Sequence, residues 1–172
     1  MQAADDWSAD VFGAIKAMGI GIVANVPDAG LTRLLDLCRG DGKICVVTLS
    51  TEEEGLGLSL GAWIGGERAL LCMQSSGVGN CINALALPNV THTPCLMLVT
   101  MRGQGGEANP WQVPMGQAVP SVLEQMGVAC FEATSPANVV DAFRRAAALA
   151  FEHREAAAVL VAQRVIGAKR FE

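Results

Sequence analysis

Apolar residues along this chain form two alternating patterns. Short, nearly continuous apolar runs of strand length recur at residues 20–26, 43–50, 68–74, 95–101, 127–133 and 157–163. The segments between them place apolar residues three and four positions apart, which is typical of helices packed on one face. Continuous apolar strands are expected in parallel sheets that are covered by helices on both faces.

Capping residues and apolar spacing predict the helices. Ser8 is placed to cap a first helix that ends at Gly19, and Ser135 followed by Pro136 starts a late helix. Further helices are predicted over residues 29–38, 51–63, 78–87 and 115–126. The alternation of strands and helices predicts a doubly wound α/β fold with a six-stranded, mostly parallel sheet. We expect residues 1–172 to form a single domain.

Composition and charge narrow the class of protein. The chain has 172 residues, and its net charge of −5 argues against a general nucleic-acid surface, although it leaves room for an anionic substrate. The start, "MQAADDWSAD", has no signal-peptide core and no apolar run is long enough to span a membrane, so we expect a cytoplasmic protein. The six Cys residues show no CxxC pair, which favours buried thiols over a zinc site.

Polar and glycine-rich loops follow several of the predicted strands, at the edge where open α/β sheets bind ligands. They are residues 25–30, 50–55, 74–80 and the 13-residue stretch "RGQGGEANPWQVP" at 102–114. A loop of that length exceeds the usual ~4–6 residues and is often functional. The "SSGVGN" run lacks the third glycine of a dinucleotide-binding fingerprint. The "GDG" at residues 40–42 has the composition of a turn at a helix end.

Three consecutive carboxylates, Glu52, Glu53 and Glu54, have two interpretations. Ser50 and Thr51 precede them with capping-box spacing, so they could simply begin a helix. Alternatively, one of them is held inside the protein for chemistry. The local sequence leaves both interpretations open, because neither a GxSxG motif nor a neighbouring base completes a catalytic set.

Four motifs taken together resemble a known family. They are "VPDAGL", "TEEEGLGLSLGAWIGG", "MQSSGVGNCINAL" and "QVPMG". They are similar to the pyrimidine-binding (Pyr) domain of thiamine diphosphate-dependent decarboxylases, and most similar to sulfopyruvate decarboxylase α subunits, with phosphonopyruvate decarboxylases as near relatives. The resemblance extends from about residue 11 to residue 165.

This resemblance implies a function. The expected reaction is decarboxylation of a small anionic 2-oxo acid, with sulfopyruvate converted to sulfoacetaldehyde and carbon dioxide. Phosphonopyruvate or another acidic 2-oxo acid is the alternative within the family, and a non-catalytic α/β assembly module is the alternative outside it. Members with phosphonopyruvate as substrate tend to carry a His where Gln112 stands here, which favours the sulfonate.

The resemblance also implies site residues. In the family, a Glu nine residues before a Gly hydrogen-bonds the aminopyrimidine of the cofactor and promotes activation of its thiazolium carbon; that Gly matches Gly61, so the Glu matches Glu52. Glu53 and Glu54 are then left for capping or the surface. Matches to the turn that lines the aminopyrimidine are Gly77, Val78, Gly79 and Asn80. Expected substrate contacts are Asp28, Arg102 and Gln112.

Half of the family's active site has no match in this chain. The family also requires a second domain, whose GDG…N motif binds Mg²⁺ and holds the cofactor's diphosphate. The resemblance therefore implies that the magnesium ligands come from a β (PP-domain) subunit, with none from this chain. The cofactor would span the interface, and apolar, glycine-rich surfaces near the loops would be subunit contacts. The oligomer count and the choice between sulfonate and phosphonate stay open at this level.

Overall fold

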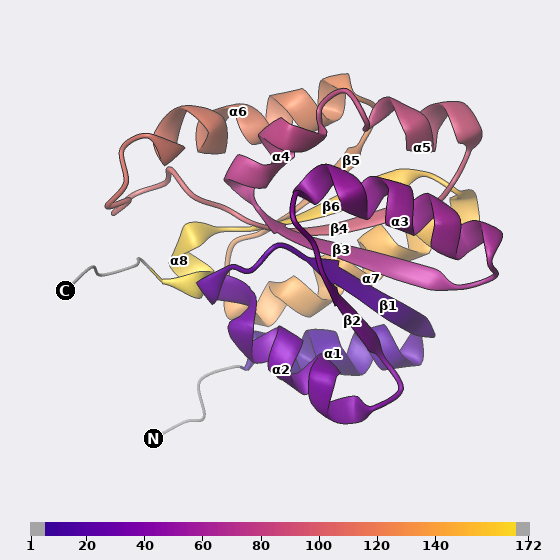
Figure 1. Cartoon of the computed structure of the whole chain (residues 1–172). Coiled ribbons are helices and arrows are strands. Elements are labelled where there is room, and N and C mark those ends of the chain that lie inside the picture. The colour runs from indigo at the N-terminus through magenta and orange to yellow at the C-terminus, as the bar shows by residue number, and fades with distance from the viewer. Residues whose placement is uncertain (1–5, 168–172) are drawn as a thin grey trace.

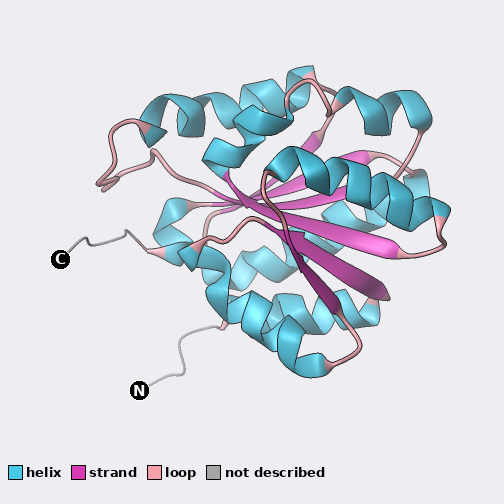
Figure 2. Cartoon of the chain, viewed as in Figure 1, coloured by secondary structure: helices cyan, strands magenta, loops and turns pink. Residues whose placement is uncertain are grey.

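The computed structural model describes residues 6–167, which form a parallel sheet between two layers of helices (Figure 1, Figure 2). The six strands are β1 (Ile20–Asn25), β2 (Cys45–Thr48), β3 (Arg68–Gln74), β4 (Cys95–Thr100), β5 (Ala129–Ala133) and β6 (Ala156–Val161). Their order across the sheet is β2-β1-β3-β4-β6-β5, and every neighbouring pair is parallel. The doubly wound sheet predicted from the sequence is confirmed.

The helices divide between the two faces of the sheet (Figure 1). One face carries α3 (Glu52–Ile64), α4 (Ser75–Cys81), α5 (Ala86–Thr91) and α6 (Gln112–Gln125). The other carries α1 (Trp7–Ala17), α2 (Thr32–Asp41) and α7 (Pro136–His153), while the short η1 (Ala29–Leu31) and α8 (Gln163–Ile166) lie at strand ends. Successive strand residues point to opposite faces, so Leu70 packs toward α1 and α2 whereas Leu71 packs toward α3. Both faces are buried, which explains the continuous apolar runs.

Two helices begin earlier than the sequence indicates. Asp6, rather than Ser8, caps α1 by accepting a hydrogen bond from the Ala9 backbone N–H at 3.2 Å. The helix predicted from residue 115 begins at Gln112, because Pro114 falls in its first turn, where backbone N–H groups have no intrahelical partner to lose. The preceding loop is correspondingly shorter than expected.

The segment after β3 also differs from the prediction. A continuous helix over residues 78–87 was expected, but α4 starts directly at Ser75 and a turn separates it from α5. Pro88 explains the break, since it cannot donate a hydrogen bond to the carbonyl four residues earlier and its ring would clash there. The "SSGVGN" run is therefore the helix itself rather than a turn that leads into it.

The sheet topology creates a crevice at the carboxyl ends of β1 and β3. The chain leaves β1 for β2 on one side and returns to β3 on the other, so the connections that follow β1 and β3 diverge. Gly55 lets α3 approach β3 closely, because a Cβ on this residue would overlap the Leu71 side chain. The first turn of α3 is thereby held against the crevice.

Candidate active site

The first turn of α3 points its three carboxylates in different directions. Glu52 is only 7% exposed, whereas Glu53 and Glu54 face solvent. The Ser50 backbone N–H donates to Glu54 Oε2 at 2.9 Å, and Thr51 makes no side-chain capping bond. The capping box predicted between Thr51 and Glu54 is thus not formed, although Glu54 still binds a free N–H at the helix start. Burial singles out Glu52 from the triplet.

Glu52 meets α4 at what we call the Glu52 corner, formed by Glu52, Gly77 and Asn80. Asn80 Nδ2 donates a hydrogen bond to Glu52 Oε2 at 2.8 Å. Gly77 lies directly against the carboxylate, and a Cβ at this position would overlap Glu52 Oε1. A glycine here is therefore a steric requirement of the buried acid.

The other two residues expected to line the cofactor face elsewhere. Val78 is buried among the core side chains beneath α4. A Cβ on Gly79 would lie 3.4 Å from Met115 Sδ at the start of α6. The structure therefore brings Gly77 and Asn80 to Glu52, while Val78 supports the fold and Gly79 allows α6 to approach.

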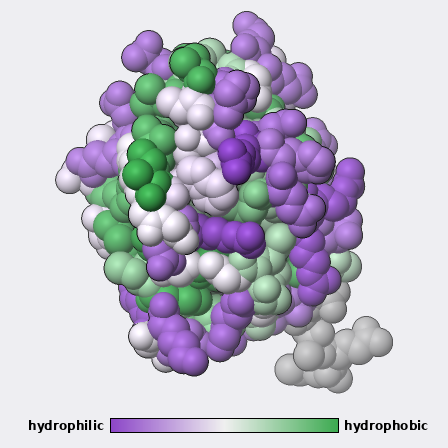
Figure 3. Space-filling model, turned by 90° about the vertical axis from the view of Figure 1, so that its right-hand side faces the viewer, coloured by the Kyte–Doolittle hydropathy of each residue, from purple (hydrophilic) through white to green (hydrophobic). Residues whose placement is uncertain are grey.

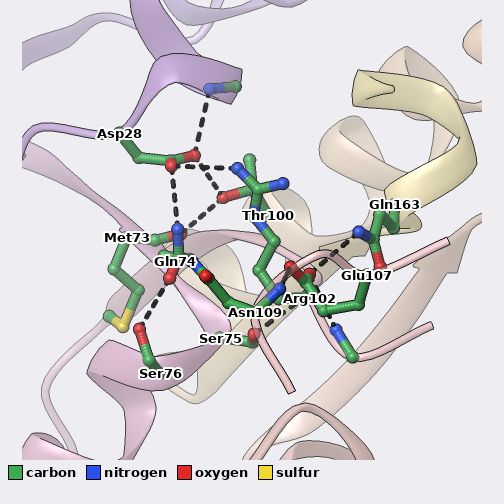
Figure 4. A network of polar contacts seen from close by, with 12 residues as sticks. Asp28, Met73, Gln74, Ser75, Ser76, Thr100, Arg102, Glu107, Asn109 and Gln163 are labelled. Carbon is green, nitrogen blue, oxygen red and sulfur yellow. Dashed lines mark hydrogen bonds and ion pairs between the residues drawn. The ribbon is translucent and has the colours of Figure 1, made fainter. Parts of the chain in front are cut away.

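A second polar cluster lies where β1, β3 and β4 end (Figure 4). We call Asp28, Gln74, Thr100 and Arg102 the Asp28–Arg102 network. Thr100 Oγ1 donates to Asp28 Oδ2 at 2.8 Å, Gln74 Nε2 donates to Oδ1 at 2.9 Å, and Arg102 Nη2 lies 3.5 Å from Oδ1. The Asp28 and Arg102 side chains are each 2% exposed, so this ion pair is removed from water. Asp28 also accepts a hydrogen bond from the Gly30 N–H and caps η1, while its contact with a substrate stays a prediction.

Arg102 has more hydrogen-bond donors than the protein satisfies. Its Nε and Nη1 atoms are buried and have no hydrogen-bond partner among residues 6–167. An unpaired buried donor costs about 1–3 kcal/mol, and more when it is charged, so such atoms call for an acceptor. Arg102 is therefore not a solvated loop residue, and its two unpaired guanidinium donors suit an oxyanion.

Gln74 connects the two clusters. Its Nε2 donates to Asp28, while its Oε1 accepts from Ser76 Oγ at 2.8 Å in the first turn of α4 (Figure 4). The neighbouring Ser75 Oγ accepts from the Arg102 backbone N–H at 3.0 Å. The helix that carries Gly77 and Asn80 is therefore hydrogen-bonded to the strand ends that carry the buried ion pair.

The loop after Arg102 is fastened by a third group, the Gln163 clamp, made of Gln104, Glu107 and Gln163. Gln163 Nε2 donates to Glu107 Oε2 at 2.9 Å. Burial alone would raise the pKa of Glu107, but hydrogen bonds from the Asn109 and Gly103 N–H groups and from Gln163 hold it below its ordinary value. Gln112, the remaining expected substrate contact, is buried at the end of this loop as the first residue of α6.

Several residues of these clusters were not predicted from the sequence. Gln74 and Thr100 are the last residues of their strands, and Gln163 comes shortly after β6. A polar residue that closes an apolar run at the carboxyl edge of a sheet is the signal that could have found them. Glu107 carries no comparable signal, because it lies in the middle of an irregular loop.

A cavity of about 220 Å³ opens beside Asp28. Its lining includes Asn25, Pro27, Thr32 and Arg39. Asn25 Oδ1 is buried and has no hydrogen-bond partner in the part of the chain that the structure describes. The cavity gives a small polar molecule space just beyond the end of β1, beside α2.

The Gly40–Gly42 stretch is a helix end, as predicted. Asp41 closes α2 and pairs with Lys16 at 2.5 Å, and Gly42 follows in the left-handed conformation with φ +72°. Within residues 6–167, no three His, Cys, Asp or Glu side chains are grouped so that they could hold a metal ion. No helix in this range is long and apolar enough to cross a membrane.

The cysteines are mostly buried thiols, as the sequence suggested. Cys38, Cys72, Cys81 and Cys95 are buried, and Cys45 is exposed. Burial, together with the charges of Glu52 and Glu53, raises the pKa of Cys81 to about 12. The thiol that packs below the Glu52 corner therefore stays protonated and behaves as a small apolar group.

Comparison with known proteins places this geometry in a family. No protein-family model matches the chain. It is, however, 34% identical over 157 residues to a sulfopyruvate decarboxylase subunit alpha from Methanothermobacter thermautotrophicus, which covers 91% of this chain and 95% of that protein. The chain belongs to the sulfopyruvate decarboxylase α-subunit family. A family member from Methanococcus maripaludis is also 34% identical, over 88% of this chain and 91% of its own length.

Other relatives carry the matching region within longer chains. A sulfopyruvate decarboxylase from Methanosarcina acetivorans is 36% identical over 115 residues, which make up 66% of this chain but 29% of that protein. A phosphonopyruvate decarboxylase from Streptomyces viridochromogenes is 31% identical over 119 residues, 68% of this chain and 30% of that protein. A solved 2-oxoglutarate:ferredoxin oxidoreductase from Magnetococcus marinus shares the fold, with a TM-score of 0.72 at 15% identity over 93% of this chain and 29% of that one.

Proposed function

We propose that this chain is the α subunit of a cytoplasmic, thiamine diphosphate-dependent decarboxylase that converts sulfopyruvate to sulfoacetaldehyde and carbon dioxide. The observation that carries the proposal is that one edge of the sheet holds both a buried acid, Glu52, and a buried Arg102 with unsatisfied hydrogen-bond donors, in a member of this family. The active site is shared with a β subunit.

The Glu52 corner fits the aminopyrimidine side of the cofactor. When bound, thiamine diphosphate supplies the electron sink for the loss of carbon dioxide. Asn80 fixes Glu52 Oε2, and the missing side chain at Gly77 keeps the helix backbone close to Oε1. Glu52 can then hold or release a proton at an aminopyrimidine nitrogen from a poorly solvated position, which is the task of a positioned general acid–base group.

The Asp28–Arg102 network fits the anionic end of the substrate. Asp28 contacts Nη2 of the Arg102 guanidinium, which leaves Nε and Nη1 as donors for sulfonate or carboxylate oxygens. Gln112, at the first turn of α6, supplies an amide for a further contact. Access requires the groups that cover Arg102 to move, because its side chain is 2% exposed in the isolated chain.

The partner subunit supplies the parts of the active site for which residues 6–167 have no candidates. We assign it the Mg²⁺ ligands and the diphosphate site. The Methanosarcina acetivorans relative supports this division, because in that protein the matching region is only a part of a longer chain. Trp111 is 68% exposed directly before Gln112, so it is the side chain best placed to meet a partner at the site.

Most other exposed large apolar residues lie at the opposite edge. Ile64 ends α3 just before β3 begins, and Leu87 and Val90 lie on α5 before β4. Figure 3 faces this side of the molecule and shows hydrophobic surface among the polar residues. The expectation that apolar contact surfaces lie near the loops is supported by Trp111. We assign the surface over α3 and α5 to other contacts in the assembled oligomer.

Phosphonopyruvate is the second candidate substrate, supported by the Streptomyces viridochromogenes relative at 31% identity. A non-catalytic assembly module is the candidate from another class. The buried Glu52 speaks against it, because burying an acid beside Gly77 has a free-energy cost that a purely structural helix would avoid.

The test is a decarboxylation assay with the chain co-expressed with its candidate β subunit. Thiamine diphosphate and Mg²⁺ are added, and sulfopyruvate and phosphonopyruvate are offered separately. We expect turnover of sulfopyruvate only when both chains are present. Preferred turnover of phosphonopyruvate would identify that acid as the substrate. No turnover of either acid by an assembled complex would favour the non-catalytic assembly module.

A further inference from the structure

The Gln163 clamp joins two segments that are distant in the sequence. Gln163 is 1% exposed and follows β6. The Gln104 N–H donates to Gln163 Oε1 at 2.9 Å, and the Gln163 N–H donates to Gln104 Oε1 at 2.8 Å. This reciprocal pair fixes the start of the 103–111 loop to the end of β6, next to the strand that carries Arg102.

Glu107 extends the clamp to the middle of the loop. Its carboxylate accepts from the Asn109 N–H at 2.9 Å, from the Gly103 N–H at 3.3 Å and from Gln163 Nε2 at 2.9 Å. One buried amide and one carboxylate thus fix the loop at Gly103, Gln104, Glu107 and Asn109. The labelled side chains in Figure 4 show Glu107 lying between Arg102 and Gln163.

The two ends of the loop touch each other. Gly103 has φ +72°, and a Cβ there would lie 2.7 Å from Val113 Cα. A Cβ on Gly116 would overlap the Arg102 carbonyl oxygen. Because the backbones are in contact at this neck, a shift of the clamped loop would displace both Arg102 and the first turn of α6.

We propose that Gln163 and Glu107 are positioning residues for substrate recognition, which act through Arg102 and Gln112. This inference rests on the proposed function and adds two residues to it. The clamp holds the two ends of the loop so that the unpaired Nε and Nη1 donors of Arg102 keep their direction. Glu107 also places a negative charge near Arg102, and the charge of Arg102 in turn contributes to lowering the pKa of the Glu107 carboxyl.

The Gln163 clamp fixes the orientation of the 103–111 loop as well as stabilising it. Apolar side chains could anchor the loop without fixing its orientation, whereas the five directed hydrogen bonds of the clamp do both. The hydrogen bonds of the clamp join the first residue of α8 to the loop, and none of them involves a residue of the Glu52 corner. Loss of the clamp should therefore weaken substrate recognition and leave cofactor binding unchanged.

The experiment compares Gln163→Leu with the wild-type protein, and uses Gln117→Leu on the exposed side of α6 as the matched control. Gln163→Glu places a second carboxylate against Glu107, and adding Glu107→Gln restores a donor–acceptor pair between the two positions. Each protein is assembled with the β subunit and measured for substrate KM, kcat, thiamine diphosphate affinity and amide hydrogen exchange at residues 103–111.

We expect Gln163→Leu to raise KM for the 2-oxo acid about tenfold, with a smaller change in kcat and none in cofactor affinity. Exchange at residues 103–111 should rise in the same variant. Gln163→Glu should behave similarly, the double variant should regain part of the loss, and Gln117→Leu should match wild type. Equal loss of cofactor and substrate affinity, or faster loop exchange with unchanged KM, would overturn the proposal.

Failure of the proposed function gives a different result. If the wild-type complex turned over no 2-oxo acid, that function would be lost. The role of the clamp would then be tested by calorimetry, which measures the affinity of the same complexes for sulfopyruvate. About tenfold weaker binding to Gln163→Leu would support the positioning role, and equal binding, or none to wild type, would overturn it.

Discussion

The Glu52 corner and the Asp28–Arg102 network bury acids in opposite ways. At the corner, a carboxylate meets one side-chain amide and a glycine. In the network, the carboxylate receives several donors and faces a cation, while it is the cation that lacks acceptors. The first arrangement suits a group that exchanges protons, and the second suits a fixed charge that receives an anion. Hydrogen-bonding partners, rather than burial alone, distinguish the two roles.

The largest effect is expected at the corner. Glu52→Gln keeps the shape of the side chain and removes its ionisation, so kcat of the assembled complex should fall roughly 10³-fold while the fold is retained. Steady-state kinetics and thermal unfolding measure the two properties. Glu53→Gln is the control, because Glu53 is the next residue and is exposed. Equal losses of kcat in both variants would indicate that the three carboxylates only cap the helix.

Removal of the guanidinium should have the next largest effect. Arg102→Met leaves the Asp28 carboxylate buried without its cation, which should lower the free energy of unfolding by about 3 kcal/mol. Arg33→Met is the matched control, because Arg33 pairs with Asp6 at the surface and its loss should cost less than about 1 kcal/mol. Urea unfolding measures the free energy of unfolding of both variants. A similar loss in each would contradict a stabilising role of the buried Asp28–Arg102 pair.

A methyl group added at the corner should have an intermediate effect. Gly77→Ala places a Cβ against Glu52 Oε1, so α4 or the carboxylate has to move; we expect about 2 kcal/mol of destabilisation and weaker thiamine diphosphate binding. Gly57→Ala adds the same methyl group to α3 where nothing lies within 4 Å, and it should stabilise the protein by up to about 1 kcal/mol. Unfolding experiments measure the change in stability, and calorimetry measures the change in thiamine diphosphate binding.

The smallest effect concerns acid stability. The pKa of Glu107 is lower in the folded protein than in the unfolded chain, so the unfolded chain binds more protons as the pH falls below about 4.3. The stabilisation by this carboxylate is complete above that pH and is lost below it. Unfolding of wild type and Glu107→Gln at neutral pH and at about pH 3.5 should show the difference between them shrinking; a constant difference would argue against the clamp geometry.

Prediction from the sequence succeeded where local patterns are strong. Six apolar runs gave the strands, and Ser135 with Pro136 gave the start of α7, where Asn138 completes the capping box. The errors fell at helix boundaries. Ser8 resembles a cap but is buried inside α1, and Pro88 lies near the start of α5, after a break that apolar spacing alone does not predict.

The site could be predicted only in part. The resemblance pointed to Glu52, and its burial next to Asn80 is consistent with that choice, but its catalytic role stays a prediction. Gln74 and Gln163 were missed because a strand-end amide has no distinctive sequence pattern. Arg102 was expected to contact the substrate, yet its pairing with Asp28 joins residues 74 positions apart that no local rule connects.

The sequence by itself determined the parallel α/β sheet, the family and the residue types at the carboxyl edge, because hydrophobic period and short motifs are local properties. Only the tertiary structure decided which of three adjacent carboxylates is buried, because that depends on the close packing of α3 on β3 at Gly55 and on the position of α4. The same is true of the Asp28–Arg102 network and the Gln163 clamp. Their partners meet only because strands distant in the sequence end side by side at one edge of the sheet.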